Sequence, residues 1–273
     1  MRTWVNGVLL TDPRGPVVGA TDHGLTVGDG VFEVLKVVDG RPFALELHLE
    51  RMARSAAGLG LPDLDAEFVR RGVEAVLEGE ALPLGRIRIT WTGGPAPLGS
   101  DRGDGPPSLF VVADAMDPWP DTTAVSTVPW PRNERGALAG LKTTSYGENV
   151  RALARARERG ASEAVFANLQ GQLCEGTGTN VFYVLDGQLR TPTLASGCLA
   201  GITRRLVLEW YGATEADVPI DEILHASEIF LTSTTRDVQG IHRWNDRELT
   251  APGPVTTEVR KAWQEREPEL LGR

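Results

Sequence analysis

The sequence predicts a mixed α/β protein made of two α+β domains. Segments rich in β-branched and aromatic residues occur in both halves of the 273-residue chain, and amphipathic helical segments lie between them. The two kinds do not alternate strictly, which argues against one doubly wound sheet. Two prolines and a loss of periodicity near 114–121 indicate an interdomain linker. We therefore expect a smaller domain at 1–116, a linker at 117–122 and a larger domain at 123–273.

The first domain is expected to contain a hairpin and two helices. β-branched and aromatic residues predict a strand at 30–38, and the Asp-Gly pair at 39–40 is typical of a hairpin turn. From Leu45 onward, apolar residues recur at three- and four-residue spacing, which predicts a helix that ends at Gly58 and Gly60. The further elements expected here are strands at 17–18, 41–45, 86–91 and 108–113, and a helix at 65–77.

The second domain is expected to contain more strands and three helices. An Asp-Gly pair at 186–187 predicts a turn between strands at 181–185 and 188–190. Helical periodicity predicts an amphipathic helix at 148–159. The further elements expected here are strands at 123–128, 163–167, 228–231 and 238–244, and helices at 201–211 and 254–264.

Composition and charge exclude several classes of function. The formal net charge is −9, so the chain lacks the basic surface that nucleic acids or anionic membranes require. It also lacks a signal-peptide pattern and an apolar run long enough for a membrane span. Cys174 and Cys198 are the only cysteines and have no zinc-ligand spacing. We expect a cytoplasmic protein without a metal site that acts on a small molecule.

Lysine is rare in this chain. Lys36, Lys142 and Lys261 are the only lysines among 28 lysine and arginine residues. An amine can lose its proton and attack a carbonyl, whereas a guanidinium stays protonated. Lys142 lies in a short polar segment before a predicted helix, which makes it a candidate for an imine-forming amine. The alternative is a solvated surface lysine in a chain whose codon bias favours arginine.

Three segments of the second half could bind an anionic ligand. Glu175 precedes small, flexible residues and a buried strand, which either aims the carboxylate at a ligand or forms a solvated turn. Thr203 follows Gly201 at the start of a helix, where free amides and a hydroxyl favour phosphate, unless this is an ordinary first turn. The four hydroxyls at 232–235 suit an oxyanion or belong to a polar loop.

Two groups in the first half could also contact a ligand. Arg51 lies on a predicted helix beside the small residues Ser55 and Gly58, so another segment could pack closely there, although a helix-flank arginine is often solvated. Phe32 and Lys36 point to the same face of a predicted strand, where the lysine either extends to solvent or meets a substrate anion.

Together these groups are the parts needed to hold pyridoxal phosphate. Five motifs resemble, in order and spacing, the motif series of the class IV aminotransferase family: DHGLTVGDGVFE at 22–33, HLER at 48–51, LK at 141–142, EGTGTNVF at 175–182 and GITR at 201–204. The match runs from about Asn6 to Gly240. The family has fold type IV, with the cofactor in the cleft between a small N-terminal and a larger C-terminal domain.

The resemblance implies a role for each site residue. Lys142 would form the Schiff base with pyridoxal phosphate and then move the substrate proton, and Glu175 would pair with the pyridine nitrogen. The implied phosphate contacts are Arg51, Ile202, Thr203 and Thr234, with Leu199 against the ring and Tyr146 near the ring oxygen. The substrate-binding candidates are Phe32, Lys36, Arg88, Thr235 and Arg236. The resemblance also implies a homodimer.

The family contains enzymes with different outcomes. Its D-amino-acid aminotransferases use an arginine and a histidine after the strand that corresponds to 86–91, and 92–98 contains neither. Val27 occupies a position that is aromatic in the transaminases. The segments around Lys142 and Glu175 most resemble aminodeoxychorismate lyase, which releases 4-aminobenzoate and pyruvate for folate biosynthesis. The alternatives are an aminotransferase for D-amino acids or branched-chain L-amino acids and, more remotely, a non-catalytic phosphate or nucleotide binder.

Overall fold

The computed structural model describes residues 1–79 and 82–273, which form two compact units. The first segment of the first unit ends at Pro118, inside the expected linker. Leu141–Tyr146, which was expected in the second domain, belongs to the first unit because its backbone pairs with a strand there. The full division is Met1–Pro118, Leu141–Tyr146 and Leu270–Arg273 for the first unit, and Trp119–Gly140 and Gly147–Glu269 for the second.

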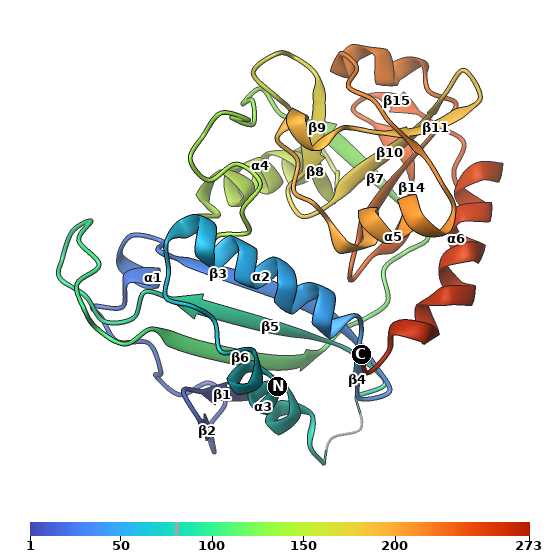
Figure 1. Ribbon diagram of the computed structural model, residues 1–273. Helices are drawn as coiled ribbons and strands as arrows, with labels where there is room; N and C mark the ends of the chain where they lie inside the picture. Colours follow the sequence, from blue (N-terminus) through green and yellow to red (C-terminus); the bar gives the residue numbers. More distant parts are fainter. Residues whose placement is uncertain (80–81) are drawn as a thin grey trace. The chain divides into compact units, whose positions relative to one another are not determined.

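The first unit is an antiparallel sheet with two helices packed on it (Figure 1). Its strands are β1 (Arg2–Val5), β2 (Val8–Leu9), β3 (Gly30–Val38), β4 (Arg41–Pro42), β5 (Leu84–Thr92) and β6 (Ser108–Ala115), and its helices are α1 (His23–Thr26), α2 (Leu45–Leu59) and α3 (Ala66–Leu77). The strand order is β2-β1-β6-β5-β3-β4. α2 packs on β3, and α3 packs on β1 and β6.

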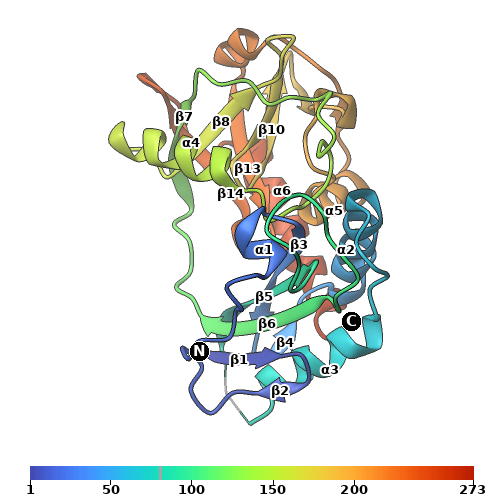
Figure 2. The same ribbon diagram turned by 90° about the vertical axis from the view of Figure 1, so that its left-hand side faces the viewer.

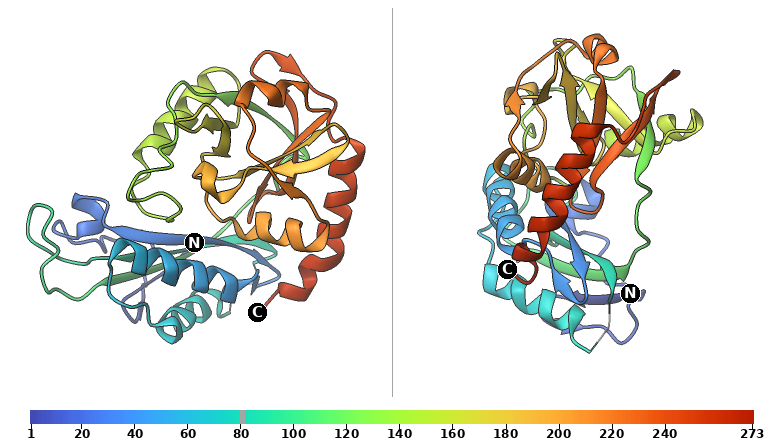
Figure 3. Two further views of the ribbon diagram at one scale, coloured as in Figure 1. Left: turned by 45° about the horizontal axis from the view of Figure 1, so that its top comes forward. Right: turned by 90° about the vertical axis from the view of Figure 1, so that its right-hand side faces the viewer.

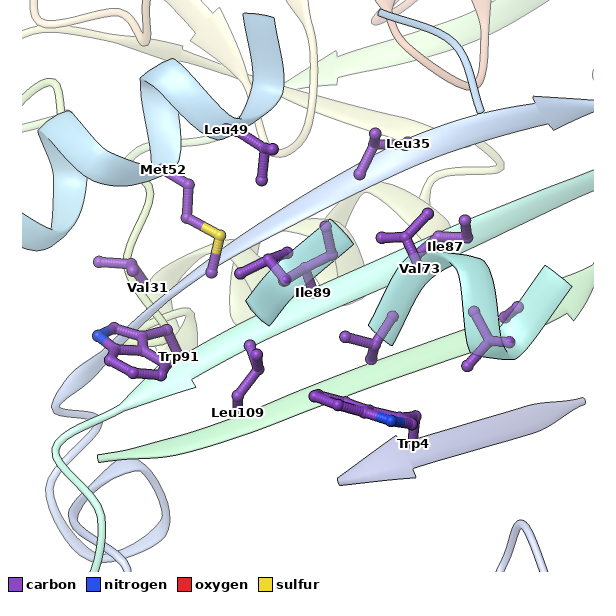
Figure 4. Close-up of a cluster of buried hydrophobic side chains, with 14 of the residues drawn as sticks. Trp4, Val31, Leu35, Leu49, Met52, Val73, Ile87, Ile89, Trp91 and Leu109 are labelled. Atoms are coloured by element: carbon purple, nitrogen blue, oxygen red, sulfur yellow. The ribbon is translucent and has the colours of Figure 1, made fainter. Parts of the chain in front are cut away.

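The core of this unit lies between the sheet and its helices. Leu49 and Met52 of α2 point toward Leu35 of β3 and Ile89 of β5 (Figure 4), and all four side chains are buried. Burying one such side chain stabilises the fold by about 1.5–3 kcal/mol. Because side chains alternate along a strand, the even-numbered residues of β3, starting with Phe32, project from the opposite face.

Three details of the first unit differ from the sequence prediction. The expected strand at 17–18 is wrong, since Val18 is exposed and these residues pair with no strand. Gly58 lies inside α2, and Gly60, with φ 72°, is the residue that ends it. The expected strand at 41–45 ends at Pro42, and Leu45 already begins α2. The two strands before residue 10 and α1 were not predicted because each is too short to show periodicity.

The second unit contains a larger, mixed sheet. Its elements are β7 (Thr122–Thr127), α4 (Gly147–Glu158), β8 (Glu163–Ala167), β9 (Leu173–Gly176), β10 (Asn180–Leu185), β11 (Gln188–Thr191), α5 (Ile202–Trp210), β12 (Thr214–Glu215), β13 (Glu228–Ser233), β14 (Asp237–Trp244), β15 (Arg247–Glu248) and α6 (Pro254–Arg266). The strand order is β12-β11-β10-β13-β14-β7-β8-β9, with β15 paired to β14. β7 runs parallel to β8 and β14, which makes the sheet mixed.

Helices pack on this sheet through small and aromatic side chains. Ala152 and Ala156 of α4 are buried against β7 and β8, which α4 crosses in Figure 2. α6 packs on β14 and α5 (Figure 3), where the rings of Trp210 and Trp263 have centroids 5.1 Å apart. In the described ranges, none of the helices has the length and apolar character of a membrane span. The predicted mixed α/β class is confirmed.

Candidate active site

Lys142 is held at the free edge of β3 by backbone pairing. Thr143 forms an antiparallel bridge with Val31, and the amide of Phe32 donates to the carbonyl of Lys142 at 3.0 Å. In this register Lys142 lies directly opposite Phe32, and opposed residues of antiparallel strands project from the same face. The lysine amine therefore lies on the face of β3 that is opposite to α2.

Phe32 contacts three of the predicted site residues. Nζ of Lys142 lies 4.5 Å from the centroid of the Phe32 ring, and Cζ of Arg88 lies 3.8 Å from it. The ring of Tyr146 meets Phe32 edge to face, with centroids 5.1 Å apart. An amine, a guanidinium and a phenol thus surround one aromatic ring. Lys36, further along the same face, is buried with Nζ 5.8 Å from the Phe43 ring centroid.

Arg88 has the properties of a carboxylate-binding group. Its side chain is accessible to solvent, but neighbouring atoms partly desolvate the guanidinium and lower its pKa, against a small opposing effect of Tyr146. Within the described part of the chain, no carboxylate forms an ion pair with Arg88. An external carboxylate that approaches this guanidinium therefore meets no competing anion of the protein.

Two small residues of α2 support the segment that carries Lys142. The amide of Lys142 donates to Oγ of Ser55 at 3.1 Å. A Cβ atom at Gly58 would lie 2.7 Å from Cδ2 of Leu141, so any larger residue here would require this leucine to shift. The close packing expected beside Ser55 and Gly58 is therefore packing against Leu141 and Lys142.

Arg51 of α2 points toward the face of β3 on which α2 packs, which is opposite to the face of Phe32 and Lys142. Its guanidinium is almost fully buried and forms two hydrogen bonds with the carboxylate of Glu33. His48 of the same helix is also hydrogen-bonded to Glu33. Neither Glu33 nor His48 was predicted to have a role, although both lie in the recognised motifs. Their isolated identities carry no signal, because the contact depends on the packing of α2 on β3.

Glu175, in β9, is held by one hydrogen bond and one ion pair in the second unit. Its Oε2 accepts a hydrogen bond from the amide of Leu199 at 2.8 Å, and its Oε1 lies 3.3 Å from Nε of Arg132. Arg132 also donates to Oδ1 of Asn149 at 3.0 Å and stacks over Phe166. The carboxylate is therefore held in a defined orientation. No sequence pattern pointed to Arg132, which is one arginine among many.

The start of α5 has the features of an anion site. Gly201 is its N-cap, and a Cβ there would lie 2.0 Å from Oδ1 of Asn180. Asn180 also donates to the carbonyl of Leu199 at 2.9 Å, which holds the turn before Ile202. The hydroxyl of Thr203 is buried and has no hydrogen-bond partner in the described residues. A helix N-terminus with such an orphaned hydroxyl fits a phosphate group.

The hydroxyl cluster lies beside this turn in the second unit. Thr232 pairs directly with Asn180 across β13 and β10, and its buried hydroxyl also finds no partner among the described side chains and backbone groups. Thr234 and Thr235 follow in the turn after β13. Arg236, in the same turn, donates to Oε1 of Gln239 at 2.6 Å.

Arg236 has further contacts inside its own unit. Cζ of Arg236 lies 3.7 Å from the centroid of the Trp119 ring, and its guanidinium donates hydrogen bonds to the hydroxyl and the carbonyl of Ser162. Burial lowers the pKa of Arg236, although Glu163 opposes this. Much of its donor capacity is therefore used by the protein, unlike that of Arg88.

The remaining titratable candidates are buried thiols. Cys174 and Cys198 precede Glu175 and Leu199, and burial raises the pKa of both, that of Cys198 to about 11. They are therefore protonated at neutral pH. No group of three or more histidine, cysteine or acidic side chains that could hold a metal ion occurs in the described ranges.

Comparisons with known proteins agree on one family. The family described as amino-transferase class IV matches residues 30–244. A putative branched-chain-amino-acid aminotransferase from Methanocaldococcus jannaschii is 30% identical over 97% of this chain and 96% of its own. A bifunctional aminodeoxychorismate lyase / D-amino acid transaminase from Mycobacterium tuberculosis is 28% identical over 88% of this chain and 90% of its own.

A solved structure gives the same result. The fold IV-transaminase CpuTA1 from Curtobacterium pusillum is 34% identical and superposes with a TM-score of 0.84 over 96% of this chain and 92% of that chain. The family match covers most of the sequence, and both folds are mixed α/β. The chain therefore belongs to the class IV aminotransferases, enzymes of fold type IV that use pyridoxal phosphate.

Proposed function

We propose that this protein is an aminotransferase in which Lys142 binds pyridoxal phosphate covalently and moves the substrate proton. The observation that carries the proposal is the contact of the Lys142 amine with Phe32 of β3, on the face of the sheet that also carries Arg88 of β5. Lysine is the residue type that can both bond to an aldehyde and act as a general base.

The groups of the second unit support the binding of this cofactor. The buried hydroxyl of Thr203, which has no partner among the described residues, the first amides of α5 from Ile202 and the turn that contains Thr234 suit its phosphate. Leu199 would contact the ring. Each carboxylate oxygen of Glu175 can accept more than one hydrogen bond, so this group can also receive the pyridine N–H while it keeps the Leu199 hydrogen bond and the Arg132 ion pair.

Each residue has a defined task in the proposed reaction. When bound, pyridoxal phosphate supplies a ring that withdraws electrons from the substrate carbon. The Lys142 amine would remove the proton from that carbon and deliver it to the cofactor, not back to the substrate. Glu175 holds a positive charge at the pyridine nitrogen, and Tyr146 lies within contact distance of the same aromatic ring as the lysine.

Arg88 favours a substrate that carries a carboxylate. Because transamination also requires an amine, this substrate is an amino acid. Its guanidinium lies against the same ring as the reacting amine and has no ion pair with a described carboxylate. The names of the relatives support branched-chain or D-amino acids as donors. Phe32, Lys36, Thr235 and Arg236 stay candidates for further substrate contacts.

Aminodeoxychorismate lyase activity is the second candidate. The bifunctional relative from Mycobacterium tuberculosis supports it, because its name joins this lyase to a transaminase. The aminodeoxychorismate substrate also carries an amine and carboxylates, so the same Lys142 and Arg88 would serve both reactions. We further propose that the protein acts as a homodimer in the cytoplasm, in keeping with the family and with two reduced cysteines.

Reduction of the purified protein with borohydride tests the central assignment. The cofactor mass should be found on the peptide with Lys142, and Lys142→Ala should lose both the adduct and activity. Lys261→Ala is the matched control, because that side chain is 78% exposed. An adduct on another lysine would contradict the proposal. Conversion of the bound cofactor by D-alanine, L-leucine or L-glutamate supports a transaminase, whereas release of 4-aminobenzoate and pyruvate from aminodeoxychorismate supports a lyase.

A further inference from the structure

We propose that Glu33 is a positioning residue that fixes the guanidinium of Arg51 for the phosphate group of the cofactor. The inference rests on the proposed function, in which Arg51 is a phosphate contact. It assigns a task to a carboxylate that does not itself need to touch the cofactor or the substrate.

Glu33 and Arg51 form a two-point contact. Nε of Arg51 donates to Oε1 of Glu33 at 2.8 Å, and Nη2 donates to Oε2 at 2.6 Å. Such paired hydrogen bonds fix the plane of the guanidinium as well as its distance. The direction of the third nitrogen, Nη1, is then determined by the position of Glu33 in β3.

The contact is largely shielded from water. The Glu33 side chain is 0% exposed and that of Arg51 is 7% exposed. Nδ1 of His48 lies 2.7 Å from Oε2 of Glu33, so this oxygen receives a second hydrogen bond. A carboxylate only accepts, so Nδ1 of His48 is the donor, and burial lowers the pKa of this ring. A buried carboxylate with three donors has little freedom to move, and neither has the arginine bound to it.

The charge of Glu33 opposes the binding of an anion. A carboxylate next to a phosphate-binding arginine partly neutralises it and repels the phosphate. If charge alone mattered, removal of the carboxylate would strengthen phosphate binding. If orientation matters more, its removal weakens phosphate binding even though the local charge becomes more positive. The two effects have opposite signs, which makes the substitution Glu33→Gln decisive.

The experiment compares two ligands with the full-length apoenzyme. Dissociation constants of pyridoxal phosphate and of pyridoxal, which lacks the phosphate, are measured by quenching of tryptophan fluorescence. We expect Glu33→Gln to raise the dissociation constant of pyridoxal phosphate by about tenfold and that of pyridoxal by less than about threefold. A general loss of structure would weaken both ligands equally. Tighter binding of pyridoxal phosphate, or an unchanged ratio of the two constants, would overturn the inference.

Three further variants complete the design. Glu33→Asp keeps the charge but shortens the side chain, so it should also weaken the binding of pyridoxal phosphate more than that of pyridoxal. It replaces Glu33→Gln if that variant does not fold. His48→Phe removes one donor to Glu33 but keeps both bonds from Arg51, so its ratio should stay near the wild-type value. Arg51→Gln separates the two hypotheses. If Arg51→Gln leaves the ratio unchanged, the proposed phosphate role of Arg51 fails. If only Arg51→Gln changes it, the positioning role of Glu33 fails alone.

Discussion

The backbone amide of Lys142 donates a hydrogen bond to the hydroxyl of Ser55 on α2, with nitrogen and oxygen 3.1 Å apart. One turn further along the helix, the absence of a side chain at Gly58 leaves space for Leu141. The lysine is therefore held from two directions, by pairing with β3 and by packing on α2.

Gly58→Val should displace the segment that carries Lys142. The new side chain meets Leu141, so we expect turnover to fall by at least about tenfold. Leu141→Ala in the same chain should restore part of the activity, because it removes the clash. Ala57→Val, at an exposed neighbouring position of α2, is the control for helix propensity. Steady-state rates of the wild type, the two single variants and the Gly58→Val/Leu141→Ala double variant check this. Equal rates for Gly58→Val and Ala57→Val would contradict it.

Arg88→Gln should affect substrates according to their charge. Loss of a charged hydrogen bond costs about 1.5–3 kcal/mol, so KM for an amino-acid donor should rise roughly 10- to 100-fold. The KM for a primary amine without a carboxylate should change by less than about threefold. Arg86→Gln, at an exposed position two residues away in β5, is the matched control. Equal effects of Arg88→Gln on both substrates would exclude Arg88 as the carboxylate contact.

Glu33 should stabilise the protein in a pH-dependent way. Burial opposes its ionisation, but the charges and hydrogen bonds of Arg51 and His48 outweigh burial and lower the pKa of Glu33 from 4.5 to about 2. A group with a lowered pKa stabilises the folded state fully above its unfolded pKa and loses that contribution as the pH falls toward the folded value. We expect roughly 3 kcal/mol to be lost between about pH 4.5 and 2. Urea unfolding at several pH values should show the difference between wild type and Glu33→Gln shrink in that window, and a constant difference would refute the coupling.

Gly201→Ala should weaken cofactor binding through the turn before α5. The added methyl group would lie 2.0 Å from Oδ1 of Asn180, so either the turn or the asparagine must move. We expect the dissociation constant of pyridoxal phosphate to rise by about tenfold or more. Gly178→Ala is the control, since nothing lies within 4 Å of its Cβ position. Fluorescence titration measures both, and similar constants for the two variants would show that the turn tolerates the change.

The sequence predicted the long elements better than the contacts among side chains. The helix at 65–77 is found as α3, within one residue, because its apolar period is regular. Lys142 was singled out by chemistry and by its motif. Arg132 and Glu33 received no role, because their partners Glu175 and Arg51 are 43 and 18 residues away, and such pairs form only when the strands and helices pack.

β3 presents different chemistry on its two sides. Phe32 shares its side with Lys142, while the next residue, Glu33, belongs to the interior with Arg51. Laboratory evolution of a new donor preference can therefore be confined to positions 32, 34 and 90, which lie on the lysine side of β3 and β5. By the role proposed for Glu33, randomising position 33 in the same library should instead weaken the binding of pyridoxal phosphate, whichever amine is the donor.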